Sequence, residues 1–208
     1  FEGEGNYGVP YNIEGYGLIV DEQLLKELLD VEDLSGFYAD YKAAGYGEFQ
    51  DMVIAMDAFI KEGGRQHFTL NGTDYATADG KTEATEKLNG VFAVAGAEKW
   101  TYGNHFGNYP ISAVYESIYD VREAEPEKAE GLRTPLIRSL QELDFLTGYT
   151  AGPEGAMERG PQYINSTVNG YDQAVQTFAE GKAVFIKNGN WIYSNVAKVA
   201  PDTAKRLT

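Results

Sequence analysis

The run Ala-Val-Phe-Ile at residues 183–186 is the feature that most narrows the possible folds of this chain. An uninterrupted apolar run of this length is expected of a strand that is buried on both faces in a parallel sheet. Such a strand requires helices on both sides of its sheet. Apolar side chains at helical spacing precede the run at residues 171–178, and a second helix is expected after Trp191.

The same alternation of apolar runs and helical patterns extends over the rest of the chain. Further strands are predicted at residues 16–20, 67–70, 74–77 and 91–95. Further helices are predicted after Asp21, from about Glu48 to Lys61, from Pro110 to Ile118, and from Thr134-Pro135 to a stop at Gly148. Strands that alternate with helices indicate an α/β fold class.

Four local signals refine this prediction. Asp21 stands before a face of leucines and is expected to cap that helix. Asn71-Gly72 is a strong hairpin-turn dipeptide between two short strands. The apolar side chains from Ile111 to Ile118 have the spacing of one helix face, which we expect to point into the core. Residues 152–170 are rich in Gly, Pro, Asn and Ser, and a loop of that length is uncommon unless it serves a site.

Composition excludes several classes of function. A formal charge of −15 repels phosphate backbones, so no nucleic-acid partner is expected. The chain has no cysteine, and its two histidines, His67 and His105, are too few and too far apart for a zinc centre. A literal GxGxxG match at residues 3–8 precedes an extended segment with proline, where a dinucleotide cannot be held. We therefore expect no cofactor, no metal and no catalytic residue.

Both tryptophans lie just beyond predicted strands. Trp100 follows residues 91–95, and Trp191 follows residues 183–186. Ligands of α/β sheets bind beyond the carboxyl ends of the strands. Aromatic faces stack on the apolar faces of sugar rings, while polar neighbours bond the hydroxyl groups. The sequence predicts a sugar site with both indoles on one concave edge. That each indole is instead a core residue or an apolar lid stays open at this point.

Three stretches of the chain resemble one protein family. The stretch GYDQAVQTFAEGKAVFIKNGNW is similar to the Gly-Lys-Ala strand and Gly-x-Trp turn of extracellular solute-binding proteins of sugar ABC importers, the maltodextrin-binding class. The stretch VPYNIEGYGLIVDEQLL resembles the entry segment of that family, and GVFAVAGAEKWTYGNHF resembles its strand and loop with a Glu-x-aromatic ligand motif. The three stretches occur in family order. The region from Val31 to Lys87 departs from the family pattern and lacks its Pro-x-Thr-Trp segment.

The resemblance implies a fold and a set of ligand-binding residues. Proteins of this family have two α/β lobes joined by hinge strands, with the sugar between the lobes. Residues 1–208 are thus expected to form one lobe of a periplasmic-binding-protein-like (type II) fold, a mixed sheet flanked by helices, as a fragment without the other lobe. The implied substrate-binding residues are Trp191, Trp100, Glu98 and Tyr171, with Tyr11 and His105 added from their position.

The implied function is the capture of a sugar or oligosaccharide for ABC permease subunits in the membrane. The protein would work outside the cytoplasm, as a cell-surface lipoprotein or in the periplasm, as a monomer and not as an enzyme. Two alternatives stay open. One is a glycoside-active secreted enzyme domain, although no spacing selects its pair of carboxylates. The other is an interaction scaffold that uses the same fold without a ligand. Polyamines, peptides and metal chelates are less expected as ligands, because the tryptophans are the main anchors.

Overall fold

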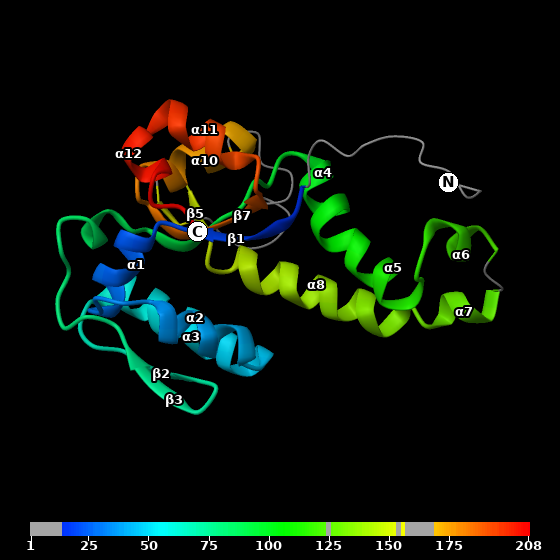
Figure 1. Ribbon diagram of the computed structural model, residues 1–208, viewed down its shortest axis with the longest axis horizontal. Coiled ribbons are helices and arrows are strands. Elements are labelled where there is room, and N and C mark those ends of the chain that lie inside the picture. Colours follow the sequence, from blue (N-terminus) through cyan, green and yellow to red (C-terminus); the bar gives the residue numbers. More distant parts are fainter. Residues whose placement is uncertain (1–13, 124–125, 153–154, 157–168) are drawn as a thin grey trace.

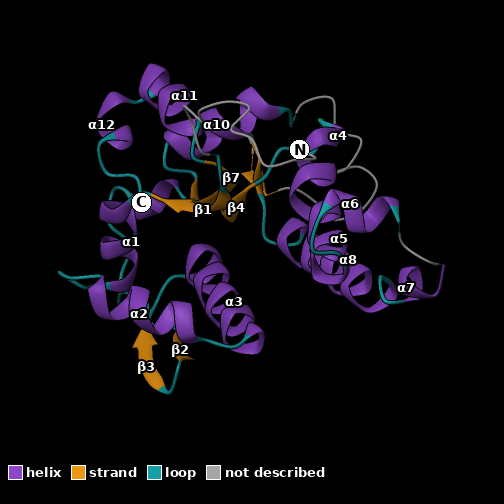
Figure 2. Ribbon diagram, turned by 45° about the vertical axis from the view of Figure 1, so that its right-hand side comes forward, coloured by secondary structure: helices purple, strands orange, loops and turns teal. Residues whose placement is uncertain are grey.

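A computed structural model describes residues 14–123, 126–152, 155–156 and 169–208 of the 208-residue chain. Tyr11, the extended segment expected before residue 14 and most of the loop expected at residues 152–170 lie outside the described residues. The fold is mixed α/β, and a mixed sheet is flanked by helices, as the sequence predicts (Figures 1 and 2).

The strands and helices follow the chain in the order that Figure 1 labels. The strands are β1 (Tyr16–Val20), β2 (His67–Leu70), β3 (Thr73–Ala76), β4 (Gly90–Ala93), β5 (Ala151–Gly152), β6 (Gly155–Ala156) and β7 (Ala183–Gly189). The longer helices are α1 (Glu22–Leu29), α2 (Ser35–Ala43), α3 (Tyr46–Glu62), α5 (Asn108–Val114), α8 (Arg133–Thr147), α10 (Tyr171–Ala179) and α11 (Ile192–Val199). Shorter helical segments are α4 (Lys99–Tyr102), α6 (Ile118–Arg122), α7 (Pro126–Glu130), α12 (Pro201–Ala204), a 3₁₀ turn (Thr85–Lys87) and a π-helical turn (Gly103–Gly107).

The strand β7 is the centre of the main sheet, whose order is β1-β7-β4. Every residue of β7 is buried except Lys187, which is half-buried. The strand β4 runs parallel to β7, but β1 runs antiparallel to it. The apolar run at residues 183–186 therefore forms the buried central strand that the sequence predicts, in a mixed sheet.

Helices cover both faces of this sheet and enclose a separate core on each side. Figure 2 shows α10, α11 and α12 on one side and α3 on the other. The core towards α3 contains side chains of α1 and α3 together with Phe92 and Phe185 of the sheet. The core towards α10 and α11 contains Val175, Phe178 and Ile186. Burial on both faces explains why β7 carries no alternation of polar and apolar residues.

Most of the local signals in the sequence are confirmed. The carboxylate of Asp21 accepts hydrogen bonds from the backbone amides of Gln23 and Leu24, and it thereby caps α1. Asn71 and Gly72 both have positive φ, 50° and 78°, as a two-residue hairpin turn between β2 and β3 requires. The helices α3, α8 and α10 lie where the spacing of apolar residues places them.

The prediction that one helix face from Ile111 to Ile118 points into the core is wrong. The helix α5 ends at Val114, and the side chains of Ile111 and Ile118 are 44% and 66% exposed. Figure 1 shows the reason, because α5 and α8 lie side by side and project away from the sheet. Their apolar faces extend beyond the two cores, and Tyr115 is the one residue of that stripe that is buried.

The end of the described chain returns to its beginning. Arg206 donates two hydrogen bonds to the carboxylate of Asp21, at 2.9 and 2.6 Å. The backbone groups of Val20 and Thr208 bond each other in both directions, at 2.9 and 3.1 Å. These contacts hold α12 and the last residues beside β1.

Within the described residues, no helix combines the length and the apolar character that a membrane crossing needs.

Candidate functional site

The chain beyond β4 is fixed by a set of hydrogen bonds to the segment before α10. The side-chain amide of Asn169 donates to the carbonyl oxygen of Val94 at 2.8 Å. The carbonyl oxygen of Asn169 accepts from the backbone amides of Gly96 and Ala97, at 2.8 and 3.2 Å. Because Asn169 is buried, water does not compete with these bonds. They place α4, which follows directly, next to the first turn of α10.

Glu98 stands at the start of α4 and reaches the amino terminus of α10. Its Oε1 atom accepts a hydrogen bond from the backbone amide of Tyr171 at 2.9 Å. A Cβ atom on Gly170 would lie 3.0 Å from the same oxygen, so a side chain there would crowd the carboxylate. The other oxygen, Oε2, is buried and has no hydrogen-bond partner among the described residues. Glu98 therefore offers a fixed acceptor with one unused oxygen.

Four aromatic side chains form a cluster beside this carboxylate, which we call the aromatic cluster: Tyr16, Trp100, Tyr171 and Trp191. The ring centroids of Trp100 lie 5.6 Å from Tyr171 and 6.4 Å from Trp191. Tyr16 contacts Trp191 edge to face, with centroids 5.4 Å apart. Trp100 and Tyr16 are 38% and 46% exposed, whereas Trp191 and Tyr171 are half-buried. Aromatic surface thus remains open to solvent.

The topology of the sheet explains why these rings meet. The parallel strands β4 and β7 bring the residues after their carboxyl ends to one edge of the sheet, where Trp100 and Trp191 follow. The antiparallel strand β1 begins at that edge, because Tyr16 pairs with Gly189. Tyr16 was not among the residues predicted from the sequence, since only the register of β1 on β7 places it there.

The indole of Trp191 is held against the backbone. A Cβ atom built on Gly189 would lie 2.1 Å from the six-membered ring of Trp191, so the ring occupies the space that any side chain at Gly189 would need. Burial raises the pKa of the Tyr171 phenol, and the nearby charge of Asp172 acts in the same direction. A hydrogen bond with Trp191 lowers that pKa. Trp191 is therefore fixed by Gly189 on one side and by Tyr171 on another.

Two of the predicted site residues cannot be placed in this cluster. Tyr11 lies outside the described residues. The backbone of His105 belongs to the π-helical turn after α4, and its side chain is not described. The other four predicted residues, Glu98, Trp100, Tyr171 and Trp191, lie together at one edge of the sheet.

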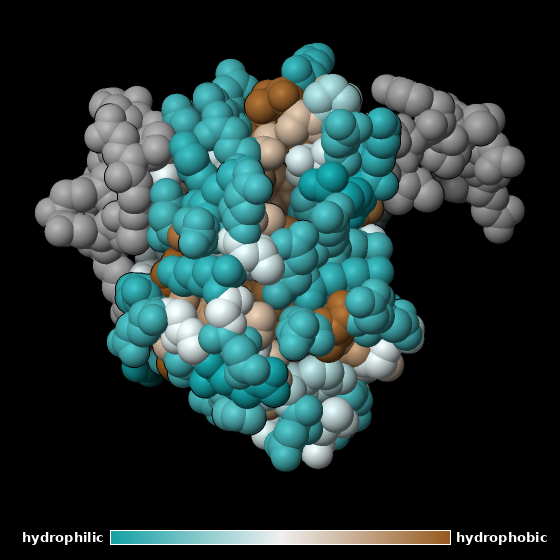
Figure 3. All heavy atoms as spheres, turned by 90° about the vertical axis from the view of Figure 1, so that its left-hand side faces the viewer, coloured by the Kyte–Doolittle hydropathy of each residue, from teal (hydrophilic) through white to brown (hydrophobic). Residues whose placement is uncertain are grey.

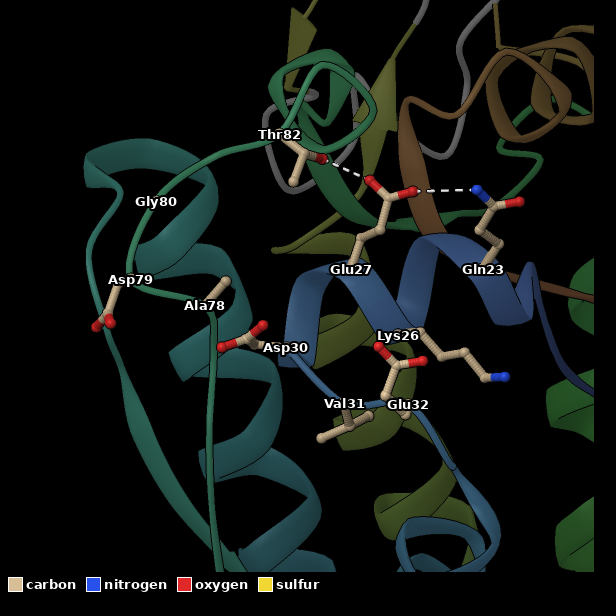
Figure 4. A pocket seen from close by; sticks show the side chains of 10 residues that line it. All are labelled: Gln23, Lys26, Glu27, Asp30, Val31, Glu32, Ala78, Asp79, Gly80 and Thr82. Carbon is tan, nitrogen blue, oxygen red and sulfur yellow. Dashed lines mark hydrogen bonds between the residues drawn. The ribbon is translucent and has the colours of Figure 1, made fainter.

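A cavity of about 500 Å³ lies elsewhere, between α1 and residues 78–82 (Figure 4). Glu27 is central to it, and its two oxygens accept hydrogen bonds from Thr82 at 2.6 Å and from Gln23 at 3.2 Å. The acidic side chain at the centre thus has partners within the chain. Among the described residues, no group of three or more histidine, aspartate or glutamate side chains is arranged to hold a metal ion.

The face of the molecule that Figure 3 shows is mainly hydrophilic. Apolar residues lie between the hydrophilic ones. This agrees with the excess of acidic over basic residues in the sequence, 32 against 17.

Comparison of the chain with protein-family models, with curated proteins and with solved structures finds no match.

Proposed function

We propose that this chain is the carbohydrate-binding lobe of an extracellular solute-binding protein that serves a sugar ABC importer. In this proposal the chain has the periplasmic-binding-protein-like type II fold and works outside the cytoplasm. It binds a sugar at the aromatic cluster without changing it, and ABC permease subunits then receive the sugar.

The observation that carries the proposal is the meeting of Trp100 and Trp191 at the carboxyl edge of β4 and β7, with centroids 6.4 Å apart. The rings are tilted by 49° to each other, so they offer two differently oriented stacking faces. Such faces suit the apolar sides of sugar rings. An enzyme of the glycoside-active class would also need a second carboxylate at a defined distance from the first.

Glu98 supplies the polar part of the proposed site. Its Oε2 atom is buried and without a partner among the described residues, and a buried unpaired acceptor is unfavourable. A sugar hydroxyl group that donates to this oxygen would satisfy it. The backbone amide of Tyr171 holds the other oxygen in place, so the carboxylate stays fixed. Because Oε2 is closed to solvent, the residues that cover it must move before a sugar hydroxyl group can reach it.

The exposure of the rings supports a site that is completed by a second surface. Within the described residues, Trp100 and Tyr16 keep 38% and 46% of their surface exposed, so these two rings are not enclosed. Small-molecule sites generally bury most of the ligand surface. We therefore propose that the aromatic cluster is half of a cleft, and that a second lobe closes over the bound sugar.

The direct test is a titration of mono- and oligosaccharides into the two-lobed protein, followed by tryptophan fluorescence. The chain has two tryptophans, and both belong to the aromatic cluster, so the emission of this lobe reports on the proposed site alone. Saturable changes, with the sugar recovered intact by chromatography, are expected. Hydrolysed sugar would favour the enzyme alternative. No response to any sugar would reject the proposal.

A further inference from the structure

Another cavity lies on the side of the sheet that α3 covers, and α3 contributes to its wall. Its volume is about 290 Å³, near the lower limit of about 300 Å³ for ligand pockets in proteins. The residues that line it are Gly17, Leu18, Tyr41, Tyr46, Phe49, Glu142, Leu146 and Lys187. They come from β1, α2, α3, α8 and β7, so the cavity exists only in the folded chain. None of them belongs to the aromatic cluster.

The cation of this cavity is Lys187, the one residue of β7 that is not fully buried. Its ammonium group lies 5.1 Å from the centre of the Phe106 ring. Among the described residues it forms no hydrogen bond and no salt bridge. Burial lowers its pKa, and the charge of Glu142 acts in the opposite direction. Lys187 thus lies in the central strand, partly buried, without a hydrogen-bonded anion among the described residues, and a partly buried cation gains from such a partner.

The anion of the same cavity is Glu142 on α8. Its charge also acts on two phenols of the cavity wall: burial raises the pKa of Tyr41 and of Tyr46, and Glu142 raises both further. Glu142 and the two hydroxyl groups form no hydrogen bond among the described residues. The residues that line the cavity therefore carry a cation, an anion and two hydroxyl groups, and none of these groups has a hydrogen bond within the described part of the chain.

The apolar wall of the cavity is held by aromatic contacts. Phe49 stacks with Tyr46 at 6.1 Å and meets Tyr41 edge to face at 6.3 Å. Phe49 also contacts the buried core residue Phe92 at 6.3 Å. Because Phe92 is fully buried, this contact anchors Phe49, and with it the aromatic wall, in the core.

We propose that this cavity binds a small zwitterion of the α-amino-acid class, with its carboxylate towards Lys187, its ammonium group towards Glu142 and an apolar side chain against the aromatic wall. A ligand with both charges satisfies both protein groups at once, whereas a simple anion or cation leaves one of them opposed by a like charge. A volume of about 290 Å³ accommodates a single amino acid. This site is independent of the proposed sugar site.

A screen of the twenty common amino acids at millimolar concentration tests the proposal. Each is added to the chain, and the thermal midpoint is measured, because a ligand that binds the folded state raises that midpoint. We expect L-leucine, or another amino acid with an apolar side chain, to raise it and to bind in isothermal titration calorimetry. If none of the twenty raises the midpoint, the proposal is rejected.

The charge requirement is tested with two analogues of leucine. Leucinamide lacks the carboxylate, and 4-methylpentanoate lacks the ammonium group, while both keep the apolar side chain. Each is expected to bind at least about tenfold more weakly than L-leucine, because one of the two charged protein groups loses its oppositely charged partner. Equal affinity of either analogue would overturn the zwitterion assignment. Binding of a neutral sugar in this cavity in place of amino acids would overturn it as well.

The protein side is tested with Lys187→Met and Glu142→Gln. Both keep the shape of the side chain, and each should weaken L-leucine binding by about tenfold or more. Lys198→Met and Glu130→Gln are matched controls, since both residues are exposed and lie outside the cavity. Unchanged affinity in folded Lys187→Met and Glu142→Gln proteins would place the amino acid elsewhere. Trp191→Ala should leave L-leucine binding unchanged, which separates this result from the sugar experiment.

Discussion

The six-membered ring of Trp191 lies over the α-carbon of Gly189, so close that a Cβ atom there would be 2.1 Å from it. We expect Gly189→Ala to displace the indole from the aromatic cluster and to weaken sugar binding by the two-lobed protein about tenfold or more. Gly103→Ala is the control, because nothing lies within 4 Å of a Cβ atom at that position. Fluorescence titration compares the two. Equal affinities would show that the indole position does not matter for binding.

Trp191 itself is expected to be the main anchor of the sugar. Removal of a rigid aromatic anchor commonly costs about 2 kcal/mol of binding free energy, or roughly a thirtyfold loss of affinity. Trp191→Ala in the two-lobed protein should show this loss, and Trp191→Phe should retain part of the affinity because a smaller ring still stacks. Calorimetry measures the affinities, since the variants lack one of the two fluorophores. A large fall in thermal midpoint together with lost binding would indicate a structural role instead.

The isolated chain is expected to bind sugar weakly or not at all. The aromatic cluster offers partly exposed rings, and a surface that covers only one side of a ligand provides half of the contacts. Calorimetric titration of residues 1–208 with the sugar that the two-lobed protein binds best checks this. Submicromolar affinity in the isolated chain would contradict the half-cleft interpretation.

Substitution of Asp21 is expected to lower the stability of the fold. Its side chain is 8% exposed, caps α1 and receives two hydrogen bonds from Arg206. Asp21→Ala is expected to lower the free energy of unfolding by about 2–4 kcal/mol, through the lost cap and the unpaired guanidinium. Asp21→Asn should lose less, because an amide still caps. Urea denaturation measures both. Lys61→Met, which breaks an exposed pair with Asp57, is the control and should change stability by about 0.5 kcal/mol or less.

Tyr75 should titrate at high pH in the folded protein. Burial, the hydrogen bond that its hydroxyl donates to Asp40 at 2.8 Å and the charge of Asp40 raise the pKa of Tyr75 to about 12. The unfolded chain has the ordinary value of about 10. Tyr75 therefore contributes stability that is complete below about pH 10 and is lost as the pH rises towards about 12.

Asp40→Asn removes the charge and weakens the hydrogen bond, because a neutral amide oxygen is a poorer acceptor than a carboxylate, so the pKa of Tyr75 should fall. The pKa of Tyr38, also about 12, arises from burial and from Glu22, and it should stay unchanged. Phenolate absorbance, with Tyr75→Phe and Tyr38→Phe proteins to assign the two groups, measures both values. A fall in both pKa values would point to a general loosening of the fold.

The elements with strong local signals were predictable from the sequence. Asp21 identified the start of α1, and Asn71-Gly72 identified the turn between β2 and β3. The helix α2 was missed because only Phe37 of its nine residues is buried, so it has no apolar stripe. The exposed stripe around Ile111 was misjudged for the opposite reason: apolar spacing shows that side chains share a face, but not what covers that face.

The sequence also predicted some residues of the candidate site and missed others. The rule that ligands gather beyond strand ends predicted a site to which Trp100 and Trp191 contribute, and the parallel pairing of β4 and β7 brings the two rings together. The position of Tyr16 depends on the register of a strand that pairs across almost the whole chain. No local pattern encodes that register. That Glu142 and Lys187 line one cavity depends on where the carboxyl-terminal part of α8 lies relative to β7, which sequence spacing does not determine.

The pairing of β1 with β7 also has a consequence for how the chain folds during synthesis. The contact between Asp21 and Arg206 spans 185 positions, and β1 has β7 as its only strand partner among the described residues. The residues of β7 must therefore leave the ribosome before β1 can pair with its strand partner. Closing so long a loop is slow, because non-local contacts form only after most of the chain entropy has been lost. Until then the apolar edge of β1 is exposed, and a chaperone that holds the nascent chain would protect it from pairing with other chains.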